Sequence, residues 1–328
     1  MNNTVTVSAP GKLMLFGEHA VVYGAPCIVT AVNQRLSIVA SNLNEPIFQL
    51  EAPDVEIKNY SKLLTHVGQG EVSKGAKFVE VATKNFINKY PSAIPEKTGV
   101  RLETLSQFKS TFGFGSSSAS AVCTIKALTE LFKPDLTQKE IFDLAYQTVL
   151  DVQGLGSGFD LAAAIYGGTL YYVAGGKTIQ PLAISHLPLI VGYTGVKADT
   201  ATIVKEVKAR FENKGEELNK IYDEIEKIVE QAKVAFKESD FKKLGELMNS
   251  NQTYLEQLGV STNKLSSIIN ASRNAGAYGA KLSGAGGGDC MIALAPENKR
   301  SAVEKAIQNA GGQVLKVEVN TNGARLET

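Results

Sequence analysis

The chain has few cysteines, few histidines and no excess of charge of either sign. Only three of its 328 residues are cysteines, Cys27, Cys123 and Cys290. They lie far apart in apolar runs and are odd in number, which predicts buried free thiols rather than disulfides or a zinc site. A formal net charge of +1 gives no surplus that would favour nucleic acid or a membrane surface as a partner.

Long apolar segments are also missing. No apolar run is long enough to span a bilayer, and the first residues lack the basic and apolar regions of a signal peptide. Together with the reduced thiols, these absences predict a cytoplasmic protein. Hydrophobic residues make up 44% of the chain, enough for a sizeable core, and the length predicts two lobes that share a cleft.

The hydrophobic pattern predicts strands first and mostly helices later. Short β-prone runs separated by Gly, Pro and polar turns predict an antiparallel or mixed sheet, whereas the polar residues 52–75 predict a surface excursion. The expected strands cover residues 5–7, 13–16, 27–32, 36–40, 167–173, 187–193, 290–294 and 314–319. Apolar spacings of three and four predict helices at 78–90, 122–132, 138–152, 218–229, 241–258 and 299–308.

A glycine- and serine-rich loop, Phe112-Gly-Phe-Gly-Ser-Ser-Ser-Ala119, directly precedes one of these helices. Its glycines let backbone N–H groups approach an anion, its serines add hydroxyl donors, and the positive end of the helix dipole faces it. These features predict a polyphosphate site made by Gly113, Gly115, Ser116, Ser117 and Ser118. Taken alone, the loop fits an ordinary serine N-cap equally well. It is not a P-loop, because no Gly-Lys-Ser/Thr closes it.

Two further glycine-containing segments accompany the serine loop. They are Ala9-Pro-Gly-Lys-Leu-Met-Leu-Phe-Gly-Glu-His-Ala-Val-Val-Tyr-Gly24 and Lys281-Leu-Ser-Gly-Ala-Gly-Gly-Gly-Asp-Cys290. The three segments resemble the three motifs of the GHMP kinases, in the family's order, and the first has the form found in mevalonate kinases. With the connecting segments, the similarity covers most of the chain.

The resemblance implies an α+β fold of two lobes with the active cleft between them. The N-terminal lobe would be similar to the second domain of ribosomal protein S5, and the C-terminal lobe would be ferredoxin-like. We expect the boundary near residue 185, so that the lobes cover residues 1–185 and 186–328. Whether the chain forms a homodimer is left open by the sequence.

The resemblance also implies an ATP- and Mg²⁺-dependent kinase whose small-molecule substrate is mevalonate. Phosphoryl transfer requires charge neutralisation and an oriented acceptor hydroxyl that loses its proton. Asp160 matches the family's catalytic aspartate, and Lys12 matches the lysine of the first motif, expected beside it. By themselves, Asp160 fits a turn-capping residue and Lys12 a solvated turn lysine. The implied nucleotide site adds Gly284, Gly286 and Gly287 to the serine loop.

The residues implied to contact the acceptor are Glu18, His19, Thr200, Ser283 and Gly284. Two of them have a structural alternative. His19, between an acidic residue and apolar ones, could equally be a buried group with its hydrogen bonds satisfied. Thr200 directly precedes an expected helix and could be its N-cap.

Magnesium is where the sequence departs most from the family. Ser117 matches the family's Mg²⁺-binding serine, but a hydroxyl needs phosphate oxygens, water and normally a carboxylate to complete the octahedron. Mevalonate kinases have a glutamate eleven residues before the catalytic aspartate, and that position is Val149 here. Asp151 is the nearest substitute, and its loss should then lower magnesium affinity. Otherwise the metal relies on nucleotide and water.

The motifs also leave the acceptor open. Gln153-Gly-Leu-Gly-Ser-Gly-Phe-Asp160 and the third motif are closer to phosphomevalonate kinases, whereas the first motif and residues 255–283 are closer to mevalonate kinases. We favour mevalonate, because a phosphorylated acceptor needs a cationic cluster for which Lys197 and Lys281 are the nearest candidates. Galactokinase, homoserine kinase or a non-catalytic ligand sensor are less favoured alternatives.

Overall fold

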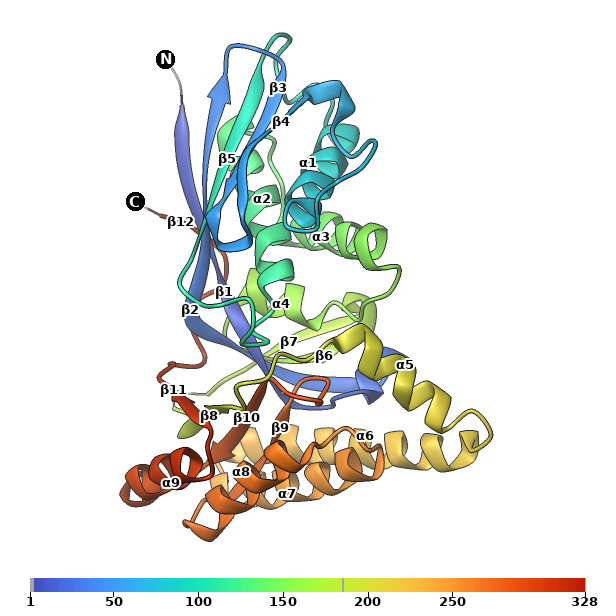
Figure 1. Ribbon diagram of the computed structural model, residues 1–328, viewed down its shortest axis with the longest axis vertical. Coiled ribbons are helices and arrows are strands. Elements are labelled where there is room, and N and C mark those ends of the chain that lie inside the picture. Colours follow the sequence, from blue (N-terminus) through green and yellow to red (C-terminus); the bar gives the residue numbers. More distant parts are fainter. Residues whose placement is uncertain (1–2, 185, 328) are drawn as a thin grey trace.

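The computed structural model describes residues 3–184 and 186–327 and contains two β-sheets with helices packed on them (Figure 1). The larger sheet has the order β12-β1-β2-β5-β3-β4, with β6 beside β2 and β7 beside β6. Its strands are β1 (Thr4–Phe16), β2 (Pro26–Leu43), β3 (Ile47–Ala52), β4 (Ile57–Leu63), β5 (Gly99–Ser106), β6 (Thr169–Val173), β7 (Thr178–Leu182) and β12 (Arg325–Glu327). One face carries α1 (Lys77–Lys89), α2 (Ser116–Phe132), α3 (Gln138–Gln153) and α4 (Phe159–Tyr166).

The smaller sheet is antiparallel, with the order β11-β8-β10-β9. Its strands are β8 (Leu189–Tyr193), β9 (Gly279–Ser283), β10 (Cys290–Leu294) and β11 (Gln313–Leu315). The accompanying helices are α5 (Thr200–Arg210), α6 (Gly215–Glu238), α7 (Phe241–Gln257), α8 (Asn263–Asn274) and α9 (Glu297–Asn309). The two-lobed α+β architecture is therefore confirmed, while the boundary expected at residue 185 falls outside the described residues.

The first four expected strands form only two strands in the structure, β1 and β2, and both are long. β1 continues through Pro10 and Gly11, where a register shift against β2 absorbs the turn-forming pair as an irregularity of the ladder. A Cβ on Gly11 would lie 3.0 Å from Phe114 Cβ, so glycine lets the serine loop approach β1 here. Lys12 directly follows this irregularity and lies next to the serine loop.

Two other expectations need correction, and two helices and five further strands are new. The expected surface excursion at 52–75 contains β4, which pairs with β3 and alternates between half-buried and exposed side chains. The expected strand 314–319 ends at Leu315, because the chain then leaves the smaller sheet and crosses to the larger one. Helix α4 and helix α8, which is capped by the Thr262 side chain, were not predicted, and neither were strands β3, β5, β7, β9 and β12. The remaining expected helices are present.

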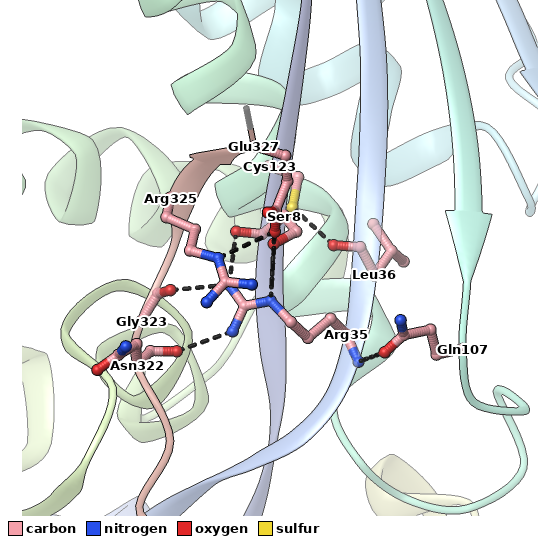
Figure 2. Close-up of polar contacts among 9 residues, drawn as sticks. All are labelled: Ser8, Arg35, Leu36, Gln107, Cys123, Asn322, Gly323, Arg325 and Glu327. Atoms are coloured by element: carbon pink, nitrogen blue, oxygen red, sulfur yellow. Dashed lines mark hydrogen bonds and ion pairs between the residues drawn. The ribbon is translucent and has the colours of Figure 1, made fainter.

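The last residues of the chain return to the larger sheet and form what we call the C-terminal strap, residues 316–327. Arg35 of β2 holds the strap (Figure 2). Its guanidinium donates to the carbonyl oxygens of Asn322 and Gly323, each at 2.8 Å, and to Ser8 Oγ of β1 at 2.7 Å. β12 then pairs with β1, so the end of the chain lies beside its beginning (Figure 1).

One hydrophobic core joins the two lobes. It runs from the strands of the larger sheet through α6 and α7 to β10, and the rings of Phe16 and Phe236 meet within it at 6.2 Å in a T-shaped arrangement. All three cysteines are buried and free, as expected. None of the helices in the described residues is long and apolar enough to cross a membrane.

Candidate active site

Helix α2 begins at the serine loop without a side-chain cap. Its N-cap is Gly115, whose φ of 78° lies in the left-handed region that favours glycine, and no described side chain bonds the first N–H groups. The alternative of a serine N-cap is therefore wrong. Because the first turn of a helix carries unsatisfied N–H donors and a positive partial charge, this end of α2 is suited to an anion.

Lys12 and Asp160 both lie close to Gly115 of this loop. The Lys12 ammonium donates to Gly113 O at 2.8 Å and lies 5.6 Å from the centre of the Phe159 ring. A Cβ added to Gly115 would stand 3.2 Å from Lys12 Cε and 3.8 Å from Asp160 Cβ. A carboxylate and an ammonium group are thus held close to the uncapped start of α2.

Asp160 comes from the first turn of α4, which starts at Gly158 with a φ of 86°. The glycine, not the aspartate, is the N-cap, so the capping alternative for Asp160 is wrong. Its Oδ2 accepts a hydrogen bond from Ser118 Oγ at 2.6 Å, and its Oδ1 accepts one from Leu161 N at 3.1 Å. Ser118 therefore orients the carboxylate as well as belonging to the loop.

The first and third motifs are fastened to each other across the lobes. His19, with φ 62°, donates from Nε2 to Ala285 O at 2.9 Å, and burial lowers its pKa below the ordinary 6.5. Ser283 Oγ donates to Met14 O at 2.8 Å and accepts from Met14 N at 3.1 Å. The buried-histidine alternative is therefore compatible with a place in the cavity, since His19 also lines it.

A fully buried ion pair completes this junction. Lys281 of β9 donates to Glu18 Oε1, and both side chains are entirely excluded from solvent. Burial raises the pKa of the Glu18 carboxyl, opposed by the Lys281 charge, and burial lowers the pKa of Lys281. Glu18 Oε2 has no hydrogen-bond partner among the described residues, and Glu18 lines the cavity. A buried acceptor without a protein side-chain or backbone partner calls for another donor, such as a buried water.

Thr200 is the first residue of α5 and lines the same cavity. The cap of this helix is Asp199, whose Oδ1 accepts from Thr202 N at 3.0 Å, so the N-cap alternative for Thr200 is wrong. The Thr200 hydroxyl therefore does not cap this helix. Lys197, three residues earlier, also lines the cavity.

The glycines of the third motif divide into two groups. Gly284 has φ 103°, and no atom lies within 4 Å of a Cβ added to it, so it faces open space in the cavity. A Cβ on Gly286 would lie 2.3 Å from Val260 O, and one on Gly287 would lie 2.5 Å from Ile203 Cδ1. These two glycines shape the loop against its neighbours and do not line the cavity.

One cavity therefore collects residues of all three motifs. The expected residues that line it are Lys12, Glu18, His19, Gly113, Gly115, Ser116, Ser117, Ser118, Asp160, Thr200, Ser283 and Gly284. Asp289 also lines the cavity, but no role was predicted for it, although it stands in the third motif directly after the glycines. The signal that could have identified it is a carboxylate at the end of a glycine run.

The carboxylate expected to bind magnesium lies elsewhere. Asp151 is exposed near the end of α3, and its two oxygens accept from Asn85 Nδ2 at 3.0 Å and Gln147 Nε2 at 2.7 Å. Asp151 is not among the cavity-lining residues, whereas Val149 is. No cluster of three metal-binding side chains occurs within residues 3–184 and 186–327. This placement does not support Asp151 as a metal ligand.

Comparison with known proteins agrees with these features. The family model described as "GHMP kinases N terminal domain" matches residues 77–168, and "GHMP kinases C terminal" matches residues 232–313. The mevalonate kinase of Thermococcus sibiricus is 38% identical, over 98% of both chains. The structure of L. major mevalonate kinase in complex with R-mevalonate has a TM-score of 0.78 at 27% identity, over 98% of this chain and 97% of that one. Streptococcus pneumoniae phosphomevalonate kinase, 19% identical, shares the fold with a TM-score of 0.80 over 96% of this chain and 99% of that one.

Proposed function

Because the chain belongs to the GHMP kinase family, we infer that it is a mevalonate kinase, which transfers the γ-phosphoryl group of ATP to the 5-hydroxyl of mevalonate. The observation that carries this inference is that Lys12 and Asp160 lie together beside Gly115, at the uncapped start of α2. Relatives named mevalonate kinase match the chain over nearly its whole length. The product is a phosphate ester for isoprenoid precursor synthesis.

Asp160 acts as the base in this reaction. Its carboxylate accepts the proton of the acceptor hydroxyl as the oxygen attacks the γ-phosphorus. Ser118 holds Oδ2 and the Leu161 N–H holds Oδ1, so the carboxylate is oriented before the acceptor arrives. Preorganisation of this kind lowers the cost of reaching the reactive geometry.

Lys12 and the start of α2 stabilise the charge that develops during transfer. The Lys12 ammonium is bonded to Gly113 O close to Asp160, where it stabilises the emerging alkoxide and the transferring phosphoryl group. The N–H groups at the start of α2 and the hydroxyls of Ser116 and Ser117 donate hydrogen bonds to the phosphate oxygens.

The donors around the loop fit Mg²⁺ in the form this ion usually takes with nucleotides. Mg²⁺ binds through one or two protein oxygens together with phosphates and water, so it does not require a cage of carboxylates. Ser117 would hold it with the ATP oxygens. When bound, the ion neutralises phosphate charge.

The cavity favours mevalonate over a phosphorylated acceptor. Among the described residues that line it, Lys12 and Lys197 are the only lysines or arginines, and Lys281 is fully buried against Glu18. A phosphate dianion normally binds several cationic or N–H donors. The Thr200 hydroxyl and the His19 ring, which line the cavity, suit the hydroxyl groups of mevalonate instead.

The test is direct phosphorylation by the purified protein. It is incubated with labelled ATP and, in separate reactions, mevalonate, 5-phosphomevalonate, galactose or homoserine, with and without Mg²⁺. We expect label only in phosphomevalonate, formed from mevalonate in the presence of Mg²⁺. Preferred labelling of 5-phosphomevalonate would replace the proposal by a phosphomevalonate kinase, and labelling of none would contradict a kinase.

A further inference from the structure

Asp289 is a charged residue in a stretch of backbone that otherwise uses glycine. Its φ is 53°, in the left-handed region, like the φ values of Gly284, Gly286 and Gly287 before it. A non-glycine residue pays a conformational cost there, although Asp and Asn pay less than most. Such a conformation persists where surrounding contacts fix it and is frequent at functional sites.

The backbone and side chain of Asp289 hold the segment that follows β8. Thr194 N donates to Asp289 O at 2.9 Å, and Asp289 N donates to Val196 O at 2.8 Å. Ala198 N then donates to Asp289 Oδ1 at 2.8 Å. The carboxylate therefore continues the β8–β10 pairing beyond the end of the sheet, in the direction of Thr200.

The other carboxylate oxygen faces the serine loop. A Cβ on Gly113 would lie 2.6 Å from Asp289 Oδ2, so this oxygen occupies the space that any side chain at position 113 would need. Gly113 O accepts from Lys12 Nζ. The result is a continuous series of contacts from Lys12 through Gly113 and Asp289 to Ala198.

We propose that Asp289 is a positioning residue that fixes residues 196–200 against the serine loop, and thereby sets how the acceptor is bound beside the nucleotide phosphates. Residues 196–200 carry the cavity-lining Lys197 and Thr200, and Ala198 is the point at which Asp289 holds them. The part of this proposal that concerns the acceptor rests on the proposed function. The attachment of residues 196–200 to the serine loop through Asp289, which we call the joint, does not.

The electrostatic surroundings agree with a hydrogen-bonding role for the carboxylate. Burial raises the pKa of Asp289, while the Ala198 N–H and the charges of Lys12 and Lys197 oppose that rise. The carboxylate interacts with the charges of two cavity lysines, so its removal would also change the electrostatic environment of both. A test must therefore separate loss of the hydrogen bond from loss of charge and from relief of backbone strain.

Two substitutions make that separation. Asp289→Asn removes the charge but keeps an oxygen for Ala198 N and tolerates a positive φ. Asp289→Gly removes the acceptor and relaxes the backbone, so it should not lower the melting temperature through strain. Ser239→Gly, at φ 56° after α6, is the matched control for glycine at a left-handed position outside the cavity.

We expect Asp289→Gly to raise KM for mevalonate about tenfold or more, with a smaller change in KM for ATP, whereas Asp289→Asn stays within about threefold of the parent protein. Loss of the joint should also speed trypsin cleavage after the exposed Lys197 in Asp289→Gly, and not in Asp289→Asn or Ser239→Gly. An unchanged mevalonate KM in Asp289→Gly, or an Asp289→Asn variant as impaired as Asp289→Gly, would overturn the proposal.

The cleavage assay keeps the two proposals apart. If mevalonate is not the acceptor but cleavage after Lys197 still accelerates in Asp289→Gly, the joint stands and the proposed function fails. Unchanged cleavage in all variants would overturn the joint whatever the acceptor proves to be.

Discussion

At the scale of single residues, the role of Asp160 as the base can be tested without disturbing the phosphate site. Asp160→Asn keeps an oxygen for Ser118 but cannot accept the acceptor's proton. We expect kcat to fall by about 10²-fold or more, with little change in the dissociation constant for ATP measured by calorimetry. Asp143→Asn, on the exposed side of α3, is the matched control and should retain activity. Near-normal turnover in Asp160→Asn would remove the assigned role.

His19 gives a prediction about pH. The folded protein favours the neutral ring, because burial lowers its pKa, so the unfolded chain binds the extra proton more readily. The stability that this residue contributes is therefore present above pH 6.5 and is lost as pH falls through that value towards the lower folded pKa. One group can account for about 1 kcal/mol of this loss within one pH unit.

The measurement is the free energy of unfolding by urea at pH 8 and pH 5.5. His19→Asn accepts the left-handed backbone but does not titrate in this range, so its stability should vary less between the two pH values than that of the parent protein. An equal pH dependence in the two proteins would show that another group is responsible.

At the scale of elements, α7 and β9 approach so closely that only glycine fits between them. A Cβ on Gly279 would lie 1.9 Å from Gly245 O. Gly279→Ala must push the helix away from the strand, and we expect a loss of about 2 kcal/mol or more in unfolding free energy. Gly215→Ala, at the start of α6 with no atom within 4 Å of the new Cβ, is the matched control and should be neutral or slightly stabilising. Equal stability of the two variants would contradict this close packing.

The same scale shows what the sequence could and could not predict. Helices α3, α6 and α7 have apolar stripes long enough to be recognised, whereas the short stripe of α8 is not distinctive. β4 escaped prediction because it is an edge strand with mostly polar residues. The more apolar strands β3 and β5 were not predicted either, although both bury side chains in the core. Local pattern therefore identifies long amphipathic helices better than individual strands of the larger sheet.

The candidate site divides in a similar way. Lys12 and Asp160 were predictable because each stands in a recognisable motif, and the structure brings them into one cavity. The position of Asp289 against Gly113 and Ala198 depends on three segments that are distant in the sequence. No local sequence pattern indicates that these three segments come together. Nor does a local pattern indicate that Asp151 is absent from the residues that line the cavity.

At the scale of the whole molecule, the two lobes are fixed to each other at the floor of the cleft. The Glu18–Lys281 pair, the His19–Ala285 bond and the shared core all cross between them. A buried pair is costly to break one partner at a time. The base of the cavity is therefore rigid, and adjustment to substrates is left to its rim, where residues 195–197 and 199–200 are exposed.

The C-terminal strap is a second connection between the lobes, and the Arg35 side chain supplies several of its hydrogen bonds. Arg35 supplies donors to Asn322 O, Gly323 O and Ser8, and it is only 7% exposed (Figure 2). Arg35→Met keeps much of the apolar stem but leaves these acceptors without donors, which should cost about 3 kcal/mol of unfolding free energy. Hydrogen exchange should also show faster opening of the strap in Arg35→Met, because only bonds such as Asn33 N to Glu318 O and Gly168 N to Thr321 O, together with the β12 pairing, then hold it. Arg101→Met, at an exposed position of β5, is the matched control. If the strap exchanges no faster in Arg35→Met than in Arg101→Met, the pairing of β12 with β1 holds the chain end by itself, and Arg35 does not fasten the lobes together.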